Sequence, residues 1–363
     1  MDFMLKHVAL ILSLLALQTP LNAQNLVESG QTLPGLWAGS AAWGDYDADG
    51  DQDLALMGEM AEDGQCMRIV RIYGNNEALL FEDQAPSEQL IGAYYGDLAW
   101  ADYDNDGDLD LAVVGWDVEN NESLRLYLND TSSGERVLAL DRLQLDNAGE
   151  ASLQGVRYAS LAWADYDSDG DPDLVVSGMG ANGTSLTLLY QNDRGVLQID
   201  DINSETLVNL HNGDLAWGDY DNDGMLDLYL SHLNGDNVLY HNEGGHFSEV
   251  AEAAGVSEPY VSFPTWFWDY DNDGWLDLFV GGYDNDAIDI AAVYLRLPTS
   301  AARSRLFRNL RDGTFVHEQD NGLEGAVLAM GANFGDLDND GFADLYIGTG
   351  NPDFRSLLPN RMY

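Results

Sequence analysis

Short apolar segments alternate with acidic turns along this chain. Leu98–Trp100 and Leu161–Trp163 stand just before two such turns, and Leu111–Val114 and Leu174–Val176 stand just after them. Short apolar runs bounded by turn residues are typical of β-strands that are buried on both faces. The pattern therefore predicts pairs of strands that are joined by acidic hairpin loops.

A second hairpin pattern lies between the acidic turns. Leu239–Asn242 is followed by Gly244–Phe247, and Leu306–Asn309 is followed by Asp312–Phe315. The Gly-Gly or Asp-Gly pair between the apolar runs favours a tight hairpin turn. Weaker copies of the pattern begin at Val70, Leu126 and Leu189. Each unit of the chain is thus predicted to contain two hairpins, or four strands.

The acidic turn occurs six times, so the chain is built from repeats. The first aspartates of the turns are Asp45, Asp102, Asp165, Asp219, Asp269 and Asp336. Five steps cover 291 residues, or about 58 residues a step, which fits a four-stranded blade. We therefore predict an all-β fold: a β-propeller of four-stranded antiparallel blades, with six blades. A seven-bladed ring and an open or truncated propeller are the alternatives.

The spacing of acids in the turns indicates a metal site. Acids stand at positions 1, 3, 5 and 9 of every copy, and glycine stands at position 6, where it permits a sharp turn. Carboxylates on alternate residues repel one another, whereas Ca²⁺ takes six to eight oxygen ligands and satisfies them. A helix-loop-helix calcium hand would need Glu at position 12, where this chain has only Leu, Val or Ile. The acid at position 9 is therefore predicted to close each loop.

The predicted ligands are the side chains at positions 1, 3, 5 and 9 and the backbone carbonyl at position 7, whose side chain is free to vary. Loop by loop they are Asp45, Asp47, Asp49, Asp51 and Asp53; Asp102, Asp104, Asp106, Asp108 and Asp110; Asp165, Asp167, Asp169, Asp171 and Asp173; Asp219, Asp221, Asp223, Met225 and Asp227; Asp269, Asp271, Asp273, Trp275 and Asp277; and Asp336, Asp338, Asp340, Phe342 and Asp344. We expect about six structural Ca²⁺ ions.

The loops and the Leu-Tyr-x-Asn hairpins together resemble the FG-GAP and VCBS repeats of integrin α-like β-propellers, over essentially all of residues 24–363. The last third resembles the ASPIC/UnbV, or cartilage acidic protein-like, group through Gly282–Asp286, Leu297–Ser300, Met330–Asn333 and Gly348–Phe354. Members of that group usually continue into a further calcium repeat and a small C-terminal domain. The resemblance implies a calcium-binding propeller and leaves a truncated chain as one interpretation of the C-terminus.

The other interpretation of the C-terminus is a closed ring. Leu26–Ser29 stands where the outermost strand of a preceding unit would stand, and Asn360–Tyr363 stands where a third strand would begin. The two ends are then expected to join in one composite blade, with three strands from the C-terminus and one from the N-terminus. We favour this closed six-bladed ring.

The first 23 residues are typical of a secretory signal peptide. Lys6 precedes the apolar stretch Val8–Leu17, and Asn22-Ala23 precede Gln24, the expected first residue of the mature chain. No other stretch has the 18 apolar residues of a membrane helix. We therefore expect a secreted protein (extracellular, cell-surface or periplasmic) without membrane insertion.

The charge limits the classes of partner, and the cysteine content limits how the fold can be stabilised. The chain carries 63 Asp and Glu against 15 Lys and Arg, a net charge of -48. Six Ca²⁺ ions would leave about -36, so nucleic acid is excluded as a partner, because a basic surface cannot be built. Cys66 is the single cysteine, so bound Ca²⁺ rather than a disulfide is expected to stabilise the fold, and its thiol is expected to be buried or semi-buried and inert.

The sequence contains no recognised catalytic motif. We therefore predict a calcium-binding extracellular binding or adhesion module, a monomer whose partner is a protein or a polysaccharide and whose Ca²⁺ is structural. An exported propeller enzyme, a polysaccharide lyase or hydrolase, is the alternative.

Two features are candidates for ligand contacts. The insertion Tyr283–Arg303 makes the fifth step the longest and is predicted to contain a short helix over Ala287–Arg296; its alternative role is packing alone. Most tryptophans stand one or two residues before a loop and are expected in the core: Trp43, Trp100, Trp163, Trp217 and Trp268. Four others do not follow that register and are the better candidates for a ligand: Trp37, Trp116, Trp266 and Trp275.

Overall fold

The protein is described by a computed structural model over residues 33–62, 64–75, 82–83, 90–129, 138–141, 153–283, 286–295, 297–319, 322–323, 328–335, 341–349 and 361–362. The predicted signal peptide and the predicted closing strand Leu26–Ser29 lie outside these residues. Within them, strands form six antiparallel sheets, and three short helices connect or flank the sheets.

The sheets follow the predicted repeat. Blade 1 contains β1 (Trp37–Gly44), β2 (Asp53–Glu62), β3 (Gln65–Gly74) and β4 (Glu82–Asp83). Blade 2 contains β5 (Ala93–Ala101), β6 (Asp110–Asp117), β7 (Glu122–Asn129) and β8 (Leu138–Leu140). Blade 3 contains β9 (Arg157–Ala164), β10 (Asp173–Met179), β11 (Ser185–Asn192) and β12 (Leu197–Ile199). Blade 4 contains β13 (Leu215–Gly218), β14 (Asp227–Leu230), β15 (Val238–Asn242) and β16 (Phe247–Glu249).

Blade 5 contains β17 (Ser262–Trp268), β18 (Asp277–Gly282), β19 (Arg305–Asn309) and β20 (Phe315–His317). Blade 6 contains β21 (Ala329–Gly335), β22 (Asp344–Thr349) and β23 (Arg361–Met362). The pairing of β23 with β22 confirms that the C-terminal residues begin a third strand. Helices α2 (Asp201–Thr206) and α3 (Ala251–Ala254) follow the outer strands of blades 3 and 4.

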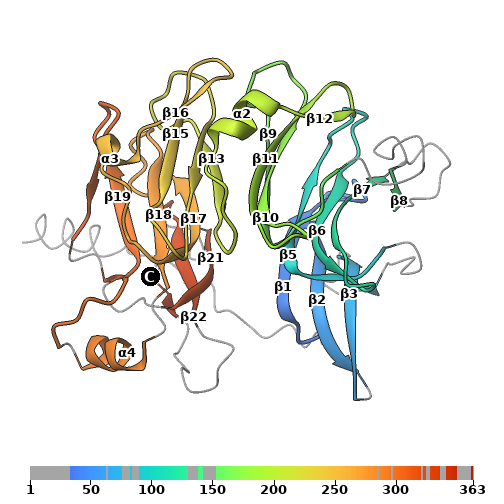
Figure 1. The fold of residues 1–363 in the computed structure, drawn as a ribbon, viewed down its shortest axis with the longest axis horizontal. Coiled ribbons are helices and arrows are strands. Elements are labelled where there is room, and N and C mark those ends of the chain that lie inside the picture. The colour runs from blue at the N-terminus through green and yellow to red at the C-terminus, as the bar shows by residue number, and fades with distance from the viewer. Residues whose placement is uncertain are drawn as a thin grey trace, which may run out of the picture.

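The six sheets form a β-propeller, as predicted. The blades succeed one another from the blue sheet at the lower right of Figure 1, through the green ones, to the orange and red sheets at the left. The first strand of each blade lies against the first strand of the next, from β1 to β21, so the first strands are the innermost. Every acidic loop connects a first strand to a second strand. All the acidic loops therefore belong to one rim of the propeller, and the starts of the first strands belong to the opposite rim.

Aromatic stacking joins one blade to the next. The tyrosine at loop position 2 stacks on the tryptophan of the following blade, with ring centroids 5.9 Å apart for Tyr46 and Trp100, 5.7 Å for Tyr103 and Trp163, and 6.4 Å for Tyr166 and Trp217. These three tryptophans pack as predicted. Trp43 was also expected in the core, but it is 52% exposed.

Blade 5 departs from the predicted tryptophan register. Phe267 pairs with Leu278 as Trp217 pairs with Leu228, so Phe267 fills the position that tryptophan has elsewhere. Trp268 stands one residue later, and a shift of one residue along a strand turns the side chain to the other face. It consequently packs in a different core cluster from Phe267.

A buried asparagine also links each of blades 2 to 5 to the acidic loop of the blade before it. The Nδ2 of Asn192, at the end of β11, donates to the carbonyl of Tyr103 in the loop of blade 2 at 2.7 Å and to that of Pro172 at 2.8 Å. Asn129, Asn242 and Asn309 make equivalent bonds to Tyr46, Tyr166 and Tyr220. Because these asparagines are buried and their Nδ2 groups donate to carbonyls of the preceding blade, the Leu-Tyr-x-Asn hairpins are connectors between blades as well as hairpins.

The predicted insertion helix is present as α4 (Ala287–Tyr294), at the lower left of Figure 1. Ile290 anchors it against the buried Leu328, while Ile288 and Leu295 are largely exposed. The expected burial of Cys66 is wrong: the thiol is exposed, because Cys66 lies at the tip of the β2–β3 hairpin. Among the described residues, no helix has the length and apolar character to cross a membrane.

Candidate functional site

The acidic loops share one backbone geometry. In the first loop, Asp45 accepts the N–H groups of Asp49 and Gly50, each at 3.0 Å, and Asp49 accepts the N–H of Asp51 at 2.9 Å. The other four loops described at these positions repeat this pattern. Gly50 has a φ of 96°, which a side chain would disfavour, so the glycine at position 6 is required by the turn.

The acid at position 9 is the most buried acid in each of the first five loops. Asp110 is 2% exposed, and its two oxygens accept only backbone N–H groups, from Asn129 at 2.8 Å and from Tyr103 at 3.3 Å. Burial raises the pKa of Asp110 to about 8, that of Asp173 to about 7 and that of Asp277 to about 6, although these backbone hydrogen bonds act in the opposite direction. A bound cation would offset the desolvation of these carboxylates.

Three carboxylates of each site converge. Oxygens from positions 1, 3 and 9 lie within 4.8 Å of one another in the first four loops: Asp45, Asp47 and Asp53; Asp102, Asp104 and Asp110; Asp165, Asp167 and Asp173; and Asp219, Asp221 and Asp227. An all-oxygen, anionic donor set of this kind suits Ca²⁺. In the sixth loop Asp336, Asp338 and Asp340 lie outside the described residues, whereas Phe342 and Asp344 lie within them.

The loops differ in the residues beside the linking asparagine that contact them, a difference that the sequence motif alone did not predict. Gln191 donates to Asp167 of the third loop at 2.5 Å. His241 places its Nδ1 3.1 Å from Asp227 and 3.5 Å from Asp221 of the fourth loop. In the fifth loop Arg311 forms an ion pair with Asp273 and holds the pKa of that carboxyl below its usual range. The sites are therefore not equivalent.

Neighbouring loops also touch each other directly. The Nδ2 of Asn105, at position 4 of the second loop, donates to Asp171 of the third loop at 2.6 Å. Asn222 and Asn272 at the same position donate to the carbonyls of Gly274 and Gly341 in the loops that follow. The candidate metal sites thus form a connected series along one rim.

A second acidic feature lies on the inner strands, and sequence reasoning missed it. Asp97 accepts a 2.6 Å hydrogen bond from Ser40, and Asp214 accepts one of 3.0 Å from Ser160. Burial, with the charge of Asp97, raises the pKa of Asp214 to about 6. All four residues stand five positions before the first aspartate of their loops. That shared position is the signal by which they are recognisable in the sequence.

Two of the tryptophans proposed as ligand contacts are packing residues instead. Trp116 stacks on Tyr94 with ring centroids 5.7 Å apart and is covered by Arg157 at 4.6 Å. Trp266 stacks on Phe279 at 4.6 Å inside a core cluster. Trp37 is 46% exposed, so it remains available to a ligand.

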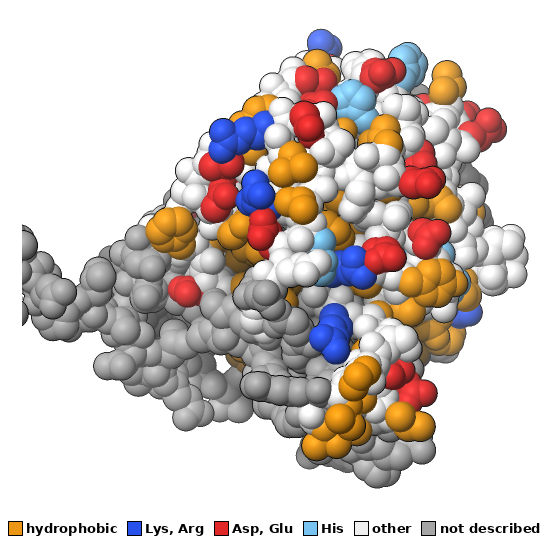
Figure 2. All heavy atoms as spheres, turned by 90° about the vertical axis from the view of Figure 1, so that its left-hand side faces the viewer, with side chains coloured by type: hydrophobic (Ala, Val, Ile, Leu, Met, Phe, Trp, Pro, Cys, Tyr) orange, Lys and Arg blue, Asp and Glu red, His pale blue; other side chains and the backbone are white. Residues whose placement is uncertain are grey.

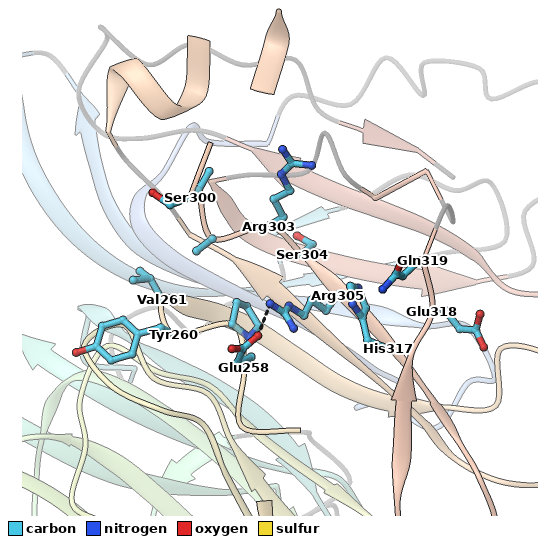
Figure 3. Close-up of a pocket in the computed structure, with 13 residues that line it drawn as sticks. Glu258, Tyr260, Val261, Ser300, Arg303, Ser304, Arg305, His317, Glu318 and Gln319 are labelled. Atoms are coloured by element: carbon cyan, nitrogen blue, oxygen red, sulfur yellow. Dashed lines mark ion pairs between the residues drawn. The ribbon is translucent and has the colours of Figure 1, made fainter. Parts of the chain in front are cut away.

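A pocket of about 500 Å³ lies at the rim opposite the acidic loops. Its walls come from the segment before β17, the end of the insertion and the end of β20, and Figure 3 shows Tyr260, Arg303 and Arg305 around it. On the face shown in Figure 2, basic side chains are scattered among acidic ones and form no continuous basic patch. The insertion, which the sequence singled out as a candidate for ligand contacts, contributes Ser300–Arg303 to the lining of this pocket.

Solved structures with a similar fold include carbohydrate-related proteins. A lectin from Agrocybe aegerita, studied for its specific recognition of non-reducing terminal N-acetylglucosamine, has 16% identity and a TM-score of 0.51, over 85% of this chain and 74% of the lectin. AofleA from Arthrobotrys oligospora has 13% identity and a TM-score of 0.46, over 90% and 82% of the two chains. A protein from Bifidobacterium bifidum named as a candidate exo-β-1,3-galactanase has 12% identity and a TM-score of 0.42, over 79% and 92%. At these identities the likeness concerns the fold alone.

No curated protein sequence matches the chain significantly. The model of the FG-GAP-like repeat family matches five times, at residues 45–113, 102–176, 165–230, 219–280 and 269–347. Each match starts at the first aspartate of one acidic loop and ends in the second strand of the next blade. The matches together cover most of the chain and coincide with the repeated loops, and the protein therefore belongs to the FG-GAP-like repeat family.

Proposed function

We propose that this protein is an exported, calcium-stabilised β-propeller that acts as a monomeric extracellular binding module. The observation that carries the proposal is the convergence of three carboxylates within 4.8 Å in successive loops, with a buried acid at position 9 in each. Such groups are costly to bury without a cation. Calcium is the ion that the oxygen-only donor sets favour, and extracellular calcium is plentiful enough for sites with a Kd of roughly 10⁻⁴ to 10⁻³ M.

Polysaccharide is the ligand class that we favour. The rim opposite the acidic loops carries the pocket and the insertion, so ligand binding and metal binding use different rims. The Agrocybe aegerita lectin indicates that a fold of this type can carry a sugar site. The high negative charge disfavours nucleic acid and anionic lipid surfaces.

Calcium stoichiometry and thermal unfolding test the proposal on the chain from Gln24. We expect about six ions per chain by atomic emission and a large fall of Tm with a chelator, because unpaired carboxylates then repel one another. Binding to a panel of neutral and acidic oligosaccharides by calorimetry tests the ligand class. Two ions or fewer, with an unchanged Tm, would contradict the calcium assignment.

A polysaccharide-cleaving enzyme is the second candidate, and the Asp97 and Asp214 pair is the observation that favours it. Glycoside hydrolases use two carboxyl groups, one of them with a raised pKa. Burial raises the pKa of both Asp97 and Asp214, and Ser160 hydrogen-bonds to Asp214 and also acts on the pKa of Asp97. The enzyme would be established if the unaltered protein releases reducing ends from a polysaccharide and the variants Asp97→Asn and Asp214→Asn do not. Unchanged polymer length with retained binding would leave the binding module.

A further inference from the structure

The pocket near the end of the insertion is built from three segments that are remote in sequence. Glu258–Val261 precede β17, Ser300–Ser304 precede β19, and His317–Gln319 end and follow β20. Because strands alternate in direction, all three segments reach the rim that lies opposite the acidic loops. The volume of the pocket, about 500 Å³, lies within the range of small-molecule sites. The recess is therefore a feature of blade 5 and its insertion, separate from the metal loops.

Ion pairs engage both glutamates of the pocket lining but only one of its two arginines. Arg305 forms an ion pair with Glu258, drawn as a dashed line in Figure 3. Glu318 forms an ion pair with Arg308 at 2.6 Å, and in Figure 3 its carboxylate points away from the other lining side chains. Arg303 has neither a hydrogen bond nor an ion pair with any residue that the structure describes. Within the described residues, one guanidinium of the lining is thus left without an anion.

An arginine without an anionic partner among the described residues is unexpected in so acidic a chain. Acids outnumber basic residues by 63 to 15, so an acidic partner within the protein would be easy to provide. The planar guanidinium presents paired donors that match carboxylate or sulfate oxygens. The missing counter-charge at Arg303 is the feature that a bound anion would supply.

The remaining lining suits a sugar ring. Tyr260 is 58% exposed, and Figure 3 shows it at the edge of the lining, with its hydroxyl directed away from the other lining residues. Aromatic side chains of this kind contact the apolar face of a ring and keep a polar tip. Ser300 and Gln319 add a hydroxyl and an amide that can bond to ring hydroxyl groups.

We propose that this pocket binds an acidic sugar at the end of a saccharide chain, with Arg303 holding its carboxylate or sulfate and Tyr260 packing on its ring. The inference rests on the proposed function as a binding module and names its ligand class and site. We specify a terminal unit because the net charge of -48 repels a long polyanion. A single anionic group at the end of a chain experiences less of this repulsion and can pair with Arg303.

Calorimetry on the calcium-loaded protein tests the site with three probes: trigalacturonate for carboxylate, a sulfated chondroitin disaccharide for sulfate, and galactotriose as the neutral control. We expect at least one acidic probe to bind at least about tenfold more tightly than galactotriose, the effect of one charge-assisted contact. Comparison of the two acidic probes identifies the anion. Equal affinity for all three probes would overturn the inference.

Matched variants locate the binding. Arg303→Ala is expected to weaken the acidic probe at least about tenfold, and Arg303→Lys to weaken it less, because the charge remains but the planar fork is lost. Tyr260→Ala should weaken binding and Tyr260→Phe should not. Arg194→Ala removes one charge from an exposed turn of blade 3 and should bind as the unaltered protein does. An unchanged Tm confirms that each variant is folded.

Three outcomes overturn the site. The first is that Arg303→Ala binds the acidic probe as tightly as the unaltered protein does. The second is that Arg194→Ala loses as much affinity for that probe as Arg303→Ala. The third is that an acidic peptide displaces the sugar with equal affinity. If the protein binds galactotriose and other neutral sugars only, the site fails while the binding module stands. If it binds none of the oligosaccharides, the polysaccharide assignment fails as well.

Discussion

At the scale of single residues, the acid at position 9 has two opposite effects. Asp110 accepts two backbone N–H groups that fix the loop, but its burial raises its pKa to about 8, so the ionised form is costly without a cation. Its neighbour Asp108 at position 7 is predicted to contribute only a backbone carbonyl. The two residues therefore separate the contribution of a side chain from that of the backbone.

Asp110→Asn is expected to remove one Ca²⁺ ion per chain and to lower the free energy of unfolding in calcium by about 1–3 kcal/mol, the cost of impairing a buried, bonded group. Asp108→Asn keeps the carbonyl and should retain the full complement of ions. Metal analysis and urea unfolding of both variants check this. Equal ion loss in the two variants would contradict the assigned role of position 7.

The carboxyl of Asp214 gives a prediction about pH. Its pKa of about 6 in the folded protein lies above the ordinary value of 3.8, so the folded state holds a proton that the unfolded state releases. Its contribution to stability is therefore complete below about pH 4 and is lost as the pH rises to about 6. Relative to Asp214→Asn, the unaltered protein should lose up to about 3 kcal/mol over this window. The free energy of unfolding of both proteins is measured in urea at several pH values. If the two values change with pH in parallel, the raised pKa of Asp214 is refuted.

Residue spacing predicted positions 1, 3 and 9 of the metal loops because the donor pattern is local. It did not predict that Gln191 and His241 cover particular loops, since they approach from the neighbouring hairpin of the blade. Nor did it find Asp97 and Asp214, whose serine partners stand in other blades. Contacts between remote segments leave no local signature in a single chain.

At the scale of elements, the connection between blades depends on the buried asparagines. Asn192 bonds to two carbonyls and accepts the N–H of Gly195 at 2.9 Å, and none of its surface is exposed. The hairpin that contains it was predicted from its turn residues. Its role as a connector was not, because its partner Tyr103 stands 89 positions earlier.

Asn192→Ala is expected to lower the free energy of unfolding by about 2–4 kcal/mol, because two buried carbonyls and one N–H lose their partner. Asn182→Ala is the control: Asn182 lies in the exposed β10–β11 turn and bonds only to Thr184 nearby. Its effect should stay below about 1 kcal/mol. Chemical unfolding in calcium compares the two, and similar losses would contradict the connector role.

Strands were also predictable where short apolar segments alternate with acidic turns. The helix α4 was predicted with an end two residues beyond the observed one. The shift of Trp268 was harder to foresee, because Phe267 and Trp268 are both large and apolar and either suits the core position. Packing against the preceding blade decides between them, and only the structure shows that packing.

At the scale of the whole molecule, charge and metal binding act together. The net charge of -48 is concentrated in part in loops that touch one another along a single rim. Without calcium these loops should repel, so added sodium chloride should raise the Tm of the chelated protein through screening. The same salt should change the Tm of the calcium-loaded protein much less. Thermal scans from about 0.05 to 1 M salt, with and without chelator, measure the difference, and equal slopes would contradict it.

The direction of the asparagine links has a consequence for how the chain is made. Each link runs backwards, from the third strand of one blade to the loop of the blade before it, across 76 to 89 positions. During synthesis, a loop therefore lacks this bond until the third strand of the next blade has been made. We therefore expect assembly in the order of synthesis, with each new blade bonded to the blade before it while the C-terminal residues are still being made.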